Sequence, residues 1–367
     1  MKWLTGIIFL ALIAAAAFFA GGYYGLAPST QVSRSIEIER PASIVFPLIA
    51  NLRTFNEVSP WYDRDPKADY TYSGPREGKD QAATWVSSVQ SVGSGDQKIT
   101  EVKENEQVDM ALNLNGKRQT AVWAFAPGRV ENGSKVTWTA TLNCGPSLLA
   151  VPCRYLNLVD QIGVQQDIET GLARLKKAAE ALPALEIASL KPEFVTVQEL
   201  DFAYLEPDTT RDEAAIDQAL KDSFAMVSGF IRSNNLAAAG PPMAVLMKQE
   251  TDKMSYRAGI PYAGATPATQ IAVKTSKTPS GLALKVITSG SRENLKPIYA
   301  RIEAYMQAHR LRASGPSWEV YLDDLATADP ATRRTAIYYP LEEASYSPTA
   351  ANADEEEGEA APVSAAP

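Results

Sequence analysis

The chain begins with a long, uninterrupted run of apolar residues. No charged residue occurs between Trp3 and Leu26, and Leu, Ile, Ala and Phe dominate these 24 positions. As a helix rising about 1.5 Å per residue, the run would extend roughly 36 Å, more than the roughly 30 Å hydrocarbon core of a bilayer. Tyr23 and Tyr24 stand near its far end, where aromatic rings favour the headgroup level. The pattern predicts an N-terminal transmembrane anchor over residues 1–30 that contacts lipid through residues 3–26.

A cleaved secretory signal is the alternative interpretation of this run. Ala15-Ala16-Ala17 would supply a small-residue cleavage site, although the run is longer than the usual signal core of about 7–15 residues. Lys2 and the amino terminus precede the run, which favours a cytoplasmic N-terminus. Both interpretations export the rest of the chain. We expect a single-pass protein of the bacterial inner membrane with its domains in the periplasm.

Residues 31–182 contain several segments in which apolar and polar positions alternate with period two. This period is typical of strands with one buried face. The segments lie at 32–39, 108–114, 121–125 and 136–142, and the turn residues Pro127-Gly128 and Asn132-Gly133 separate the last two. Apolar residues then recur at helical spacing between Ile162 and Ala179. An antiparallel meander closed by one long helix is predicted.

Three tryptophans fall in this part of the chain, at Trp85, Trp123 and Trp138. A curved sheet that meets a single helix need not be filled at its centre, so these indoles are candidates for the lining of a ligand cavity. The alternative is that they fill the core. The residue pattern leaves both interpretations open.

Several short motifs in this part carry a family resemblance. They are Arg40–Phe46, Ser59-Pro60-Trp61 with Asp65-Pro66, Tyr70–Gly74 and Thr170–Lys176. Together they resemble a polyketide cyclase/dehydrase-type domain of the START-like (SRPBCC) superfamily. The resemblance implies a helix-grip fold and a cavity for a hydrophobic or lipid-like ligand. It does not imply catalysis, because such families include binders, carriers and enzymes.

Cys144 and Cys153 flank an eight-residue, turn-rich segment. In an exported protein they would form a disulfide that closes a small loop and contributes roughly 2–3 kcal/mol. The alternative is two free thiols whose side chains diverge. Two Cys and one His do not make a closed zinc site without carboxylates, so we expect no metal site and no cofactor.

Residues 183–191 form the predicted linker, and an internal repeat follows within residues 192–342. With a shift of 75 residues, positions 230–247 align with 305–322, and Leu236, Gly240 and Pro241 match Leu311, Gly315 and Pro316. Each copy predicts a strand, an amphipathic helix stopped by the Gly-Pro turn, and a further strand. The strands before the helices are expected at 194–205 and 282–288. The repeat predicts a duplicated strand-helix-strand-strand domain of the α+β class.

The repeat also singles out a candidate site. Glu319 and Tyr321 share one face of a predicted strand, Trp318 lies on the other face, and the first copy has Ala244 and Leu246 at the corresponding positions. If that face is buried, Glu319 must be neutral, hydrogen-bonded or ready for a cation. The alternative is an edge strand whose Glu319 faces water beside Asp323 and Asp324.

Gly315-Pro316, Trp318–Tyr321 and Ile337–Leu341 resemble a GyrI-like small-molecule-binding domain, also called the AraC-type effector-binding domain. The resemblance implies a groove in which the acid at the Glu319 position meets a ligand, in some members a cationic drug. A few relatives hydrolyse strained electrophiles with such an acid. The chain departs from the family at Ser289-Gly290-Ser291, where many members have His-Gly-Pro.

Composition narrows the classes of function. The net charge of −8 argues against binding to nucleic acid, which needs clustered Lys and Arg. Residues 343–367 are rich in Ala, Pro and acid and are expected to be disordered. The sequence therefore predicts a membrane-anchored, non-catalytic binder or sensor. It would take a hydrophobic or lipid-like ligand in the first domain and a small ligand, a cation among the candidates, in the second. An envelope hydrolase or cyclase that uses Glu319 is the alternative.

Overall fold

The computed structural model describes residues 2–129, 131, 133–249, 253–265 and 272–343. The predicted acidic tail lies outside these residues, apart from Glu343. The chain divides into two compact units, Met1–Glu186 and Ile187–Pro367, here called unit 1 and unit 2. The division falls within the predicted linker 183–191.

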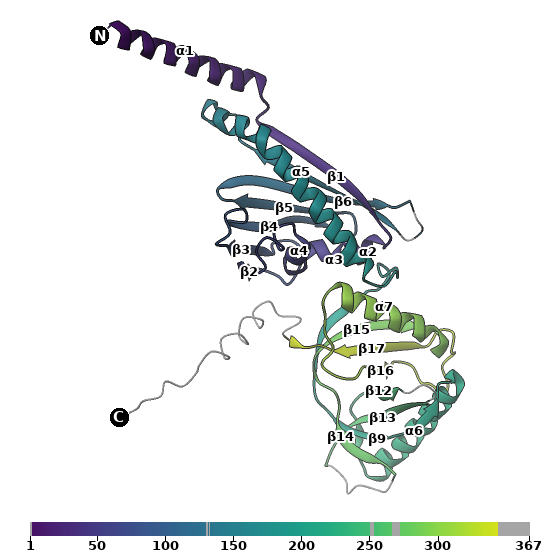
Figure 1. Ribbon diagram of the computed structural model, residues 1–367. Coiled ribbons are helices and arrows are strands. Elements are labelled where there is room, and N and C mark those ends of the chain that lie inside the picture. The colour runs from purple at the N-terminus through teal and green to yellow at the C-terminus, as the bar shows by residue number, and fades with distance from the viewer. Residues whose placement is uncertain (1, 130, 132, 250–252, 266–271, 344–367) are drawn as a thin grey trace, which may run out of the picture. The chain divides into compact units, whose positions relative to one another are not determined.

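The apolar run forms helix α1 (Lys2–Gly25), drawn in purple in Figure 1. Within the described part of the chain, its residues Trp3–Gly25 make the one helix that is long and apolar enough to cross a membrane. A signal sequence near the N-terminus can meet the same criteria of length and composition. The helix is therefore consistent with both interpretations of the run.

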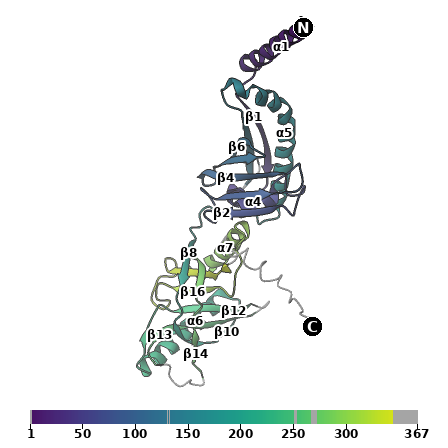
Figure 2. The ribbon, with the colours of Figure 1, turned by 90° about the vertical axis from the view of Figure 1, so that its left-hand side faces the viewer.

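Unit 1 contains a seven-stranded antiparallel sheet in the order β1-β7-β6-β5-β4-β3-β2. The sheet confirms the predicted meander, since β3 to β7 pair in chain order and β1 then pairs with β7. Three short helices connect β1 to β2 (Figures 1 and 2). The elements are β1 (Ser29–Ile38), α2 (Ala42–Val45), α3 (Pro47–Ala50), α4 (Leu52–Val58), β2 (Asp69–Ser73), β3 (Ala82–Val86), β4 (Ser94–Lys103), β5 (Gln107–Leu114), β6 (Lys117–Pro127) and β7 (Ser134–Asn143).

A long helix, α5 (Val151–Glu180), follows the short helix η1 (Leu148–Ala150) and packs against the sheet (Figure 1). The helix begins eleven residues before the predicted Ile162, and Pro152 suits its first turn because proline lacks the N–H that would be unpaired there. Gly171 lets α5 approach the sheet, since a Cβ at this position would lie 2.7 Å from the Trp138 ring. This arrangement fits the expected helix-grip fold.

Cys144 and Cys153 form a disulfide. Cys144 follows the last residue of β7 directly, and Cys153 is the third residue of α5. The bond therefore ties the end of the sheet to the start of the helix that covers it.

Unit 2 contains a second antiparallel sheet, with the main order β14-β9-β13-β12-β16-β17-β15-β8 and two short strands, β10 and β11, paired with β13. Two helices carry the apolar residues that pack on it. The elements are β8 (Glu193–Val197), β9 (Asp201–Leu205), β10 (Asp208–Thr210), α6 (Glu213–Ser233), β11 (Ala237–Ala238), β12 (Met243–Gln249), β13 (Lys253–Ala263), β14 (Lys274–Lys277), β15 (Gly281–Ser289), η2 (Arg292–Asn294), α7 (Leu295–Ala308), β16 (Trp318–Tyr321) and β17 (Arg334–Pro340).

The strand order of unit 2 is the same on both sides of its centre. From the central pair β12 and β16, the order outward is β12-β13-β9 on one side and β16-β17-β15 on the other. Asn235 and Arg310, which are 75 residues apart, both have left-handed backbone angles, with φ of 53° and 54°. These features agree with the sequence repeat, while a duplicated GyrI-like domain remains a prediction.

Two predictions about unit 2 were wrong in detail. The helices end at Ser233 and Ala308, well before the Gly-Pro turns, because the backbone reverses at the left-handed residues Asn235 and Arg310. The single strand expected at 194–205 is two strands: β8 pairs with β15 at one edge of the sheet, and β9 pairs with β13 near the other. Only β9 belongs to the symmetric pattern.

Candidate functional site

The centre of unit 1 holds two stacked indoles. Trp123 of β6 and Trp138 of β7 are directly opposite each other in register, and their ring centroids are 4.2 Å apart. Phe55 of α4 packs edge-on against both rings. Both tryptophans are almost fully buried. The two rings therefore fill much of the space between the sheet and the helices, where the sequence analysis considered a ligand cavity.

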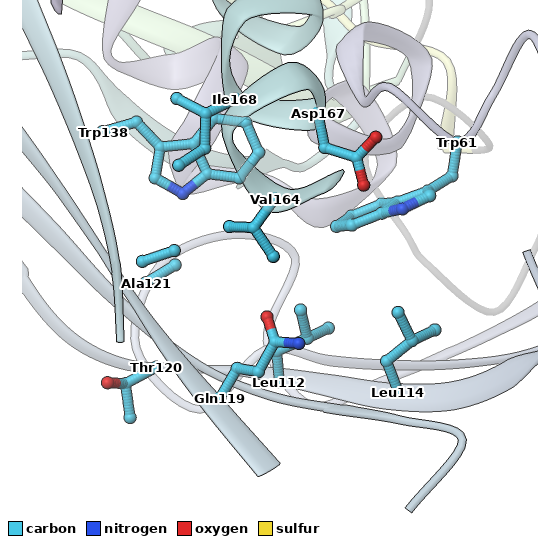
Figure 3. A pocket seen from close by; sticks show the side chains of 11 residues that line it. Trp61, Leu112, Leu114, Gln119, Thr120, Ala121, Trp138, Val164, Asp167 and Ile168 are labelled. Atoms are coloured by element: carbon cyan, nitrogen blue, oxygen red, sulfur yellow. The ribbon is translucent and has the colours of Figure 1, made fainter. Parts of the chain in front are cut away.

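A small cavity remains beside this pair. Ala121 and Ala140 are also opposite each other on β6 and β7, and their short side chains leave space under α5 next to Trp138. The cavity has a volume of about 40 Å³, and about 410 Å³ of unfilled space lies in and around it, part of it a cleft open to solvent. The lining residues are Trp61, Leu112, Leu114, Gln119, Thr120, Ala121, Trp138, Ala140, Val164, Asp167 and Ile168 (Figure 3).

The indole N–H of Trp138 has no hydrogen-bond acceptor among the described residues, and neither has that of Trp123. A buried polar group without a partner costs about 1–3 kcal/mol, so such groups are rare in folded proteins. Figure 3 shows the Trp138 ring nitrogen on the side of the ring that faces Ala121 and the cavity. The cavity thus has largely apolar walls, and the buried N–H of Trp138 lies beside it without an acceptor among the described residues.

Ion pairs join the turn after α4 to α5 at the edge of the cleft. Arg64, in the turn after α4, pairs with Asp167 of α5, and Arg174 of α5 pairs with Asp63. Trp61 lies in the same turn and lines the cleft opposite Trp138 (Figure 3). These pairs connect the turn to α5.

The structure does not bring the three predicted tryptophans together at the cavity. Trp138 lines it and Trp123 stacks behind Trp138, but Trp85 packs over Gly95 of β4 and beside Tyr70 of β2. The sequence interpretation missed Trp61, Val164, Asp167 and Ile168. Trp61 had a signal, since it belongs to the Ser59-Pro60-Trp61 motif. The α5 residues had none, because which face of a long helix meets a cavity depends on the packing of the whole sheet.

In unit 2, Glu319 lies at the centre of the sheet. Its strand β16 pairs with β12 and β17, and Glu319 is opposite Ala244, its counterpart in the sequence repeat. Only 3% of Glu319 is exposed, so the alternative of a water-facing edge strand is wrong. The burial of this face, expected from the repeat, is confirmed.

The Glu319 carboxylate is held by groups of its own chain. Arg292 of η2 donates from Nη2 to Oε2 at 2.7 Å and from Nη1 to Oε1 at 3.2 Å. Tyr299 of α7 donates to Oε1 at 2.8 Å, and the hydroxyl of Tyr321 bonds to Oε2. On its other side Arg292 donates from Nε to Asp217 of α6 at 2.9 Å. A buried guanidinium thus stands where the sequence interpretation expected a cationic ligand.

These contacts fix the ionisation of the site. Burial would raise the pKa of Glu319, but the Arg292 charge and the three donors outweigh burial and hold its pKa below the usual value. Burial and the neighbouring Glu319 charge raise the pKa of Tyr299 well above normal. Glu319 is therefore an ionised, fully hydrogen-bonded carboxylate. Trp318 lies on the opposite face of β16, stacked on Tyr338, so it does not share a pocket with Glu319.

Acidic pH is expected to lower the stability of unit 2 through the ion pair between Glu319 and Arg292. Because the pKa of Glu319 is lower in the folded chain than the value of about 4.3 in an unfolded one, its contribution is complete above that value. The contribution is lost as the pH falls through the lower folded pKa. Thermal unfolding of wild type and Glu319→Gln between pH 7 and pH 3 tests this, with a steeper acid loss expected for the wild type. Parallel pH profiles for the two proteins would contradict the assignment.

Among the described residues no three His, Cys, Asp or Glu side chains are grouped as a metal site.

Residues 29–180 match the model of the family described as polyketide cyclase / dehydrase and lipid transport. The match supports a ligand-binding role for unit 1. No curated protein sequence matches the chain.

Solved structures share low identity with the chain. EcmrR in a DNA complex is 13% identical over 53% of this chain and 72% of its own, with a TM-score of 0.38. The EcmrR C-terminal domain is 12% identical over 42% of this chain and 98% of its own, with a TM-score of 0.36. Protein Ms6760 from Mycobacterium smegmatis is 17% identical over 41% of this chain and 91% of its own, with a TM-score of 0.30.

Proposed function

We propose that unit 1, whose residues 29–180 match a ligand-binding family, binds a small apolar molecule in the cavity beside Trp138. The observation that carries the proposal is a buried, unpaired indole N–H that faces a largely apolar cavity. Such a site complements a ligand with an apolar body and a single acceptor oxygen, such as a carbonyl or a carboxyl group. The acceptor would remove the cost of the unpaired donor.

The size of the cavity suggests how the ligand enters. Pockets for drug-sized ligands usually measure about 300–1,000 Å³, so a cavity of about 40 Å³ suits only the tip of such a molecule. The adjoining open cleft would hold the rest. Release of Arg64 from Asp167 would let the turn that carries Trp61 move away and admit a larger body.

We further propose that α1 anchors the protein in a membrane and that both units lie on its extracytoplasmic side. The length and composition of α1 support the anchor. The disulfide Cys144–Cys153 supports an oxidising compartment, because such bonds are rare in a reducing cytosol.

For unit 2 we propose neither a cationic ligand nor a catalytic role at Glu319. A small cation at Glu319 would have to displace the Arg292 guanidinium, which already makes two hydrogen bonds to that carboxylate. The same contacts argue against Glu319 as the base of a hydrolase or cyclase, because both oxygens are occupied. We therefore propose a binding protein and not an enzyme, with its ligand in unit 1.

Trp138→Phe tests the proposal. The substitution keeps an aromatic ring in the stack but removes the N–H. It should therefore weaken the binding of a ligand with a carbonyl acceptor by about 0.5–1.5 kcal/mol, which is a roughly two- to tenfold loss of affinity. Prodan, a naphthalene with one ketone, is a suitable probe. Native mass spectrometry of the detergent-extracted protein gives the fraction that carries one prodan.

Trp85→Phe is the matched control, since Trp85 lies outside the cavity and its replacement should leave prodan binding unchanged. Equal losses in the two variants, or no loss in Trp138→Phe, would exclude Trp138 as the donor to the ligand.

A further inference from the structure

The surface of unit 1 carries an unusual set of apolar side chains on η1 and the first turns of α5. Leu149 is 86% exposed, Val159 70% and Ile162 66%. Six large apolar residues are exposed in this segment, and we call them the apolar rim: Leu148, Leu149, Leu156, Leu158, Val159 and Ile162. Leu156, Val159 and Ile162 recur every three residues, so they lie along one side of the helix. Exposed apolar groups of this extent mark contact with a protein or a membrane.

The segment that carries the rim is also poor in charge. From Cys144 to Val164 the chain has two charged residues, Arg154 and Asp160. Arg154 is buried, and its guanidinium donates to the backbone oxygens of Tyr23, Leu26 and Gly145. The outer side of a water-facing helix normally carries several charges. The rim is therefore poorly suited to water.

The rim is continuous with the apolar helix α1. The ring of Tyr155 stacks on Phe18 with centroids 4.5 Å apart, and its hydroxyl donates to the Phe18 backbone oxygen at 3.3 Å. Gly22 permits close contact, because a Cβ there would lie 2.4 Å from Val151. Both ribbon views place the start of α5 beside the C-terminal end of α1 (Figures 1 and 2). Together with Arg154, these contacts fix the rim at that end of the helix.

The depth of these contacts relative to a bilayer follows from helix geometry. Phe18 is seven residues before the last residue of α1, Gly25, which corresponds to about 10 Å along the axis. A helix of 24 residues extends about 36 Å and exceeds a hydrocarbon core of about 30 Å by only a few ångströms at each end. If α1 spans a membrane, Tyr155 meets it below the hydrocarbon boundary. A groove of about 530 Å³ between α1 and η1 lies at this level, and it is lined by Ala16, Phe19, Ala20, Tyr23, Tyr24, Pro146, Ser147 and Leu148.

We propose that the apolar rim inserts into the lipid leaflet at the C-terminal end of α1. The inference rests on the membrane anchor proposed above and adds a second contact with lipid, made by the folded unit itself. Val164, which lines the ligand cavity, follows Ile162 of the rim by two residues. Insertion would therefore bring the cleft to the membrane surface, where it would receive its ligand from the lipid phase.

Site-directed spin labelling of the full chain in vesicles of phosphatidylethanolamine and phosphatidylglycerol tests this inference. Single cysteines replace Leu149 and Ile162 in the rim, Leu12 in α1, and Val86, an equally exposed apolar residue on β3. Collision of each nitroxide with oxygen, which concentrates in lipid, is compared with its collision with a water-soluble nickel chelate. Labels at 149, 162 and 12 should favour oxygen, and the label at 86 should favour nickel.

The four sites separate the possible failures. If the label at 12 favours oxygen but those at 149 and 162 behave like that at 86, the inserted rim is excluded and the anchor stands. If the label at 12 favours nickel, the anchor fails and the inference fails with it. If the labels at 149 and 162 are shielded from both reagents, a protein surface covers the rim in place of lipid, and the inference is overturned.

Discussion

Arg292→Ala is expected to destabilise unit 2 by about 3–5 kcal/mol, because the substitution leaves the buried Glu319 carboxylate without its cation. Arg292 is 6% exposed and contacts Glu319 and Asp217 at once. Hydrogen exchange of peptides from β16 and α7 in the full chain measures the loss locally. Protection in these peptides should fall sharply, while peptides of unit 1 stay unchanged.

Arg334→Ala provides the control for this prediction. Arg334 also pairs with a carboxylate, Asp323, but its side chain is 58% exposed, so water replaces the lost partner and little stability should change. Arg292→Met combined with Glu319→Gln should recover much of the loss, since it removes both charges of the pair. If Arg292→Ala proves as stable as Arg334→Ala, the buried pair does not organise unit 2.

Ala121→Leu is expected to reduce the binding of prodan at least tenfold, or by about 1.4 kcal/mol, because the larger side chain fills the space beside Trp138. Ala121 is 8% exposed and lines the cavity between β6 and α5. The fraction of protein that carries one prodan in native mass spectra measures the effect.

Ala124→Leu is the matched control, since Ala124 is on the same strand but is exposed and does not line the cavity. It makes the same chemical change and should leave prodan binding intact. Thermal unfolding of both variants shows whether overpacking, which costs typically about 1–3 kcal/mol, disturbs the fold. A folded Ala121→Leu protein with wild-type occupancy would place the ligand elsewhere.

The sequence predicted β1, β5, β6 and β7 of unit 1 because apolar and polar residues alternate with period two in these strands, while β2, β3 and β4 were not predicted. Val108 and Met110 are buried on β5 as the alternation requires, and so are Val136, Trp138, Ala140 and Leu142 on β7. The start of α5 was missed because its first turns do not have an apolar face toward the core and a polar face toward water. Their outer side carries the apolar rim, and Arg154 and Asn157 are buried on the inner side.

The candidate sites were predicted less well than the fold, because their contacts join residues that are far apart in the sequence. The repeat favoured a buried Glu319 without excluding a water-facing edge strand. Its partner Arg292 is 27 residues away and reaches it only through the packing of η2 against the sheet. Ser289-Gly290-Ser291, where the chain departs from the GyrI-like pattern, ends one residue before Arg292 and was the available signal. In unit 1 the cavity arises from two alanines beside two tryptophans, and strand alternation does not encode which small residues will be neighbours.

Native mass spectrometry of the full-length protein, extracted from membranes in mild detergent without added ligand, tests the central claim most directly. If unit 1 binds an apolar molecule, the spectra should contain a protein species with one small bound molecule, and that species should be absent from Ala121→Leu but present in Ala124→Leu. Bare protein in all three preparations, or the same adduct in Ala121→Leu, would contradict a ligand held beside Trp138.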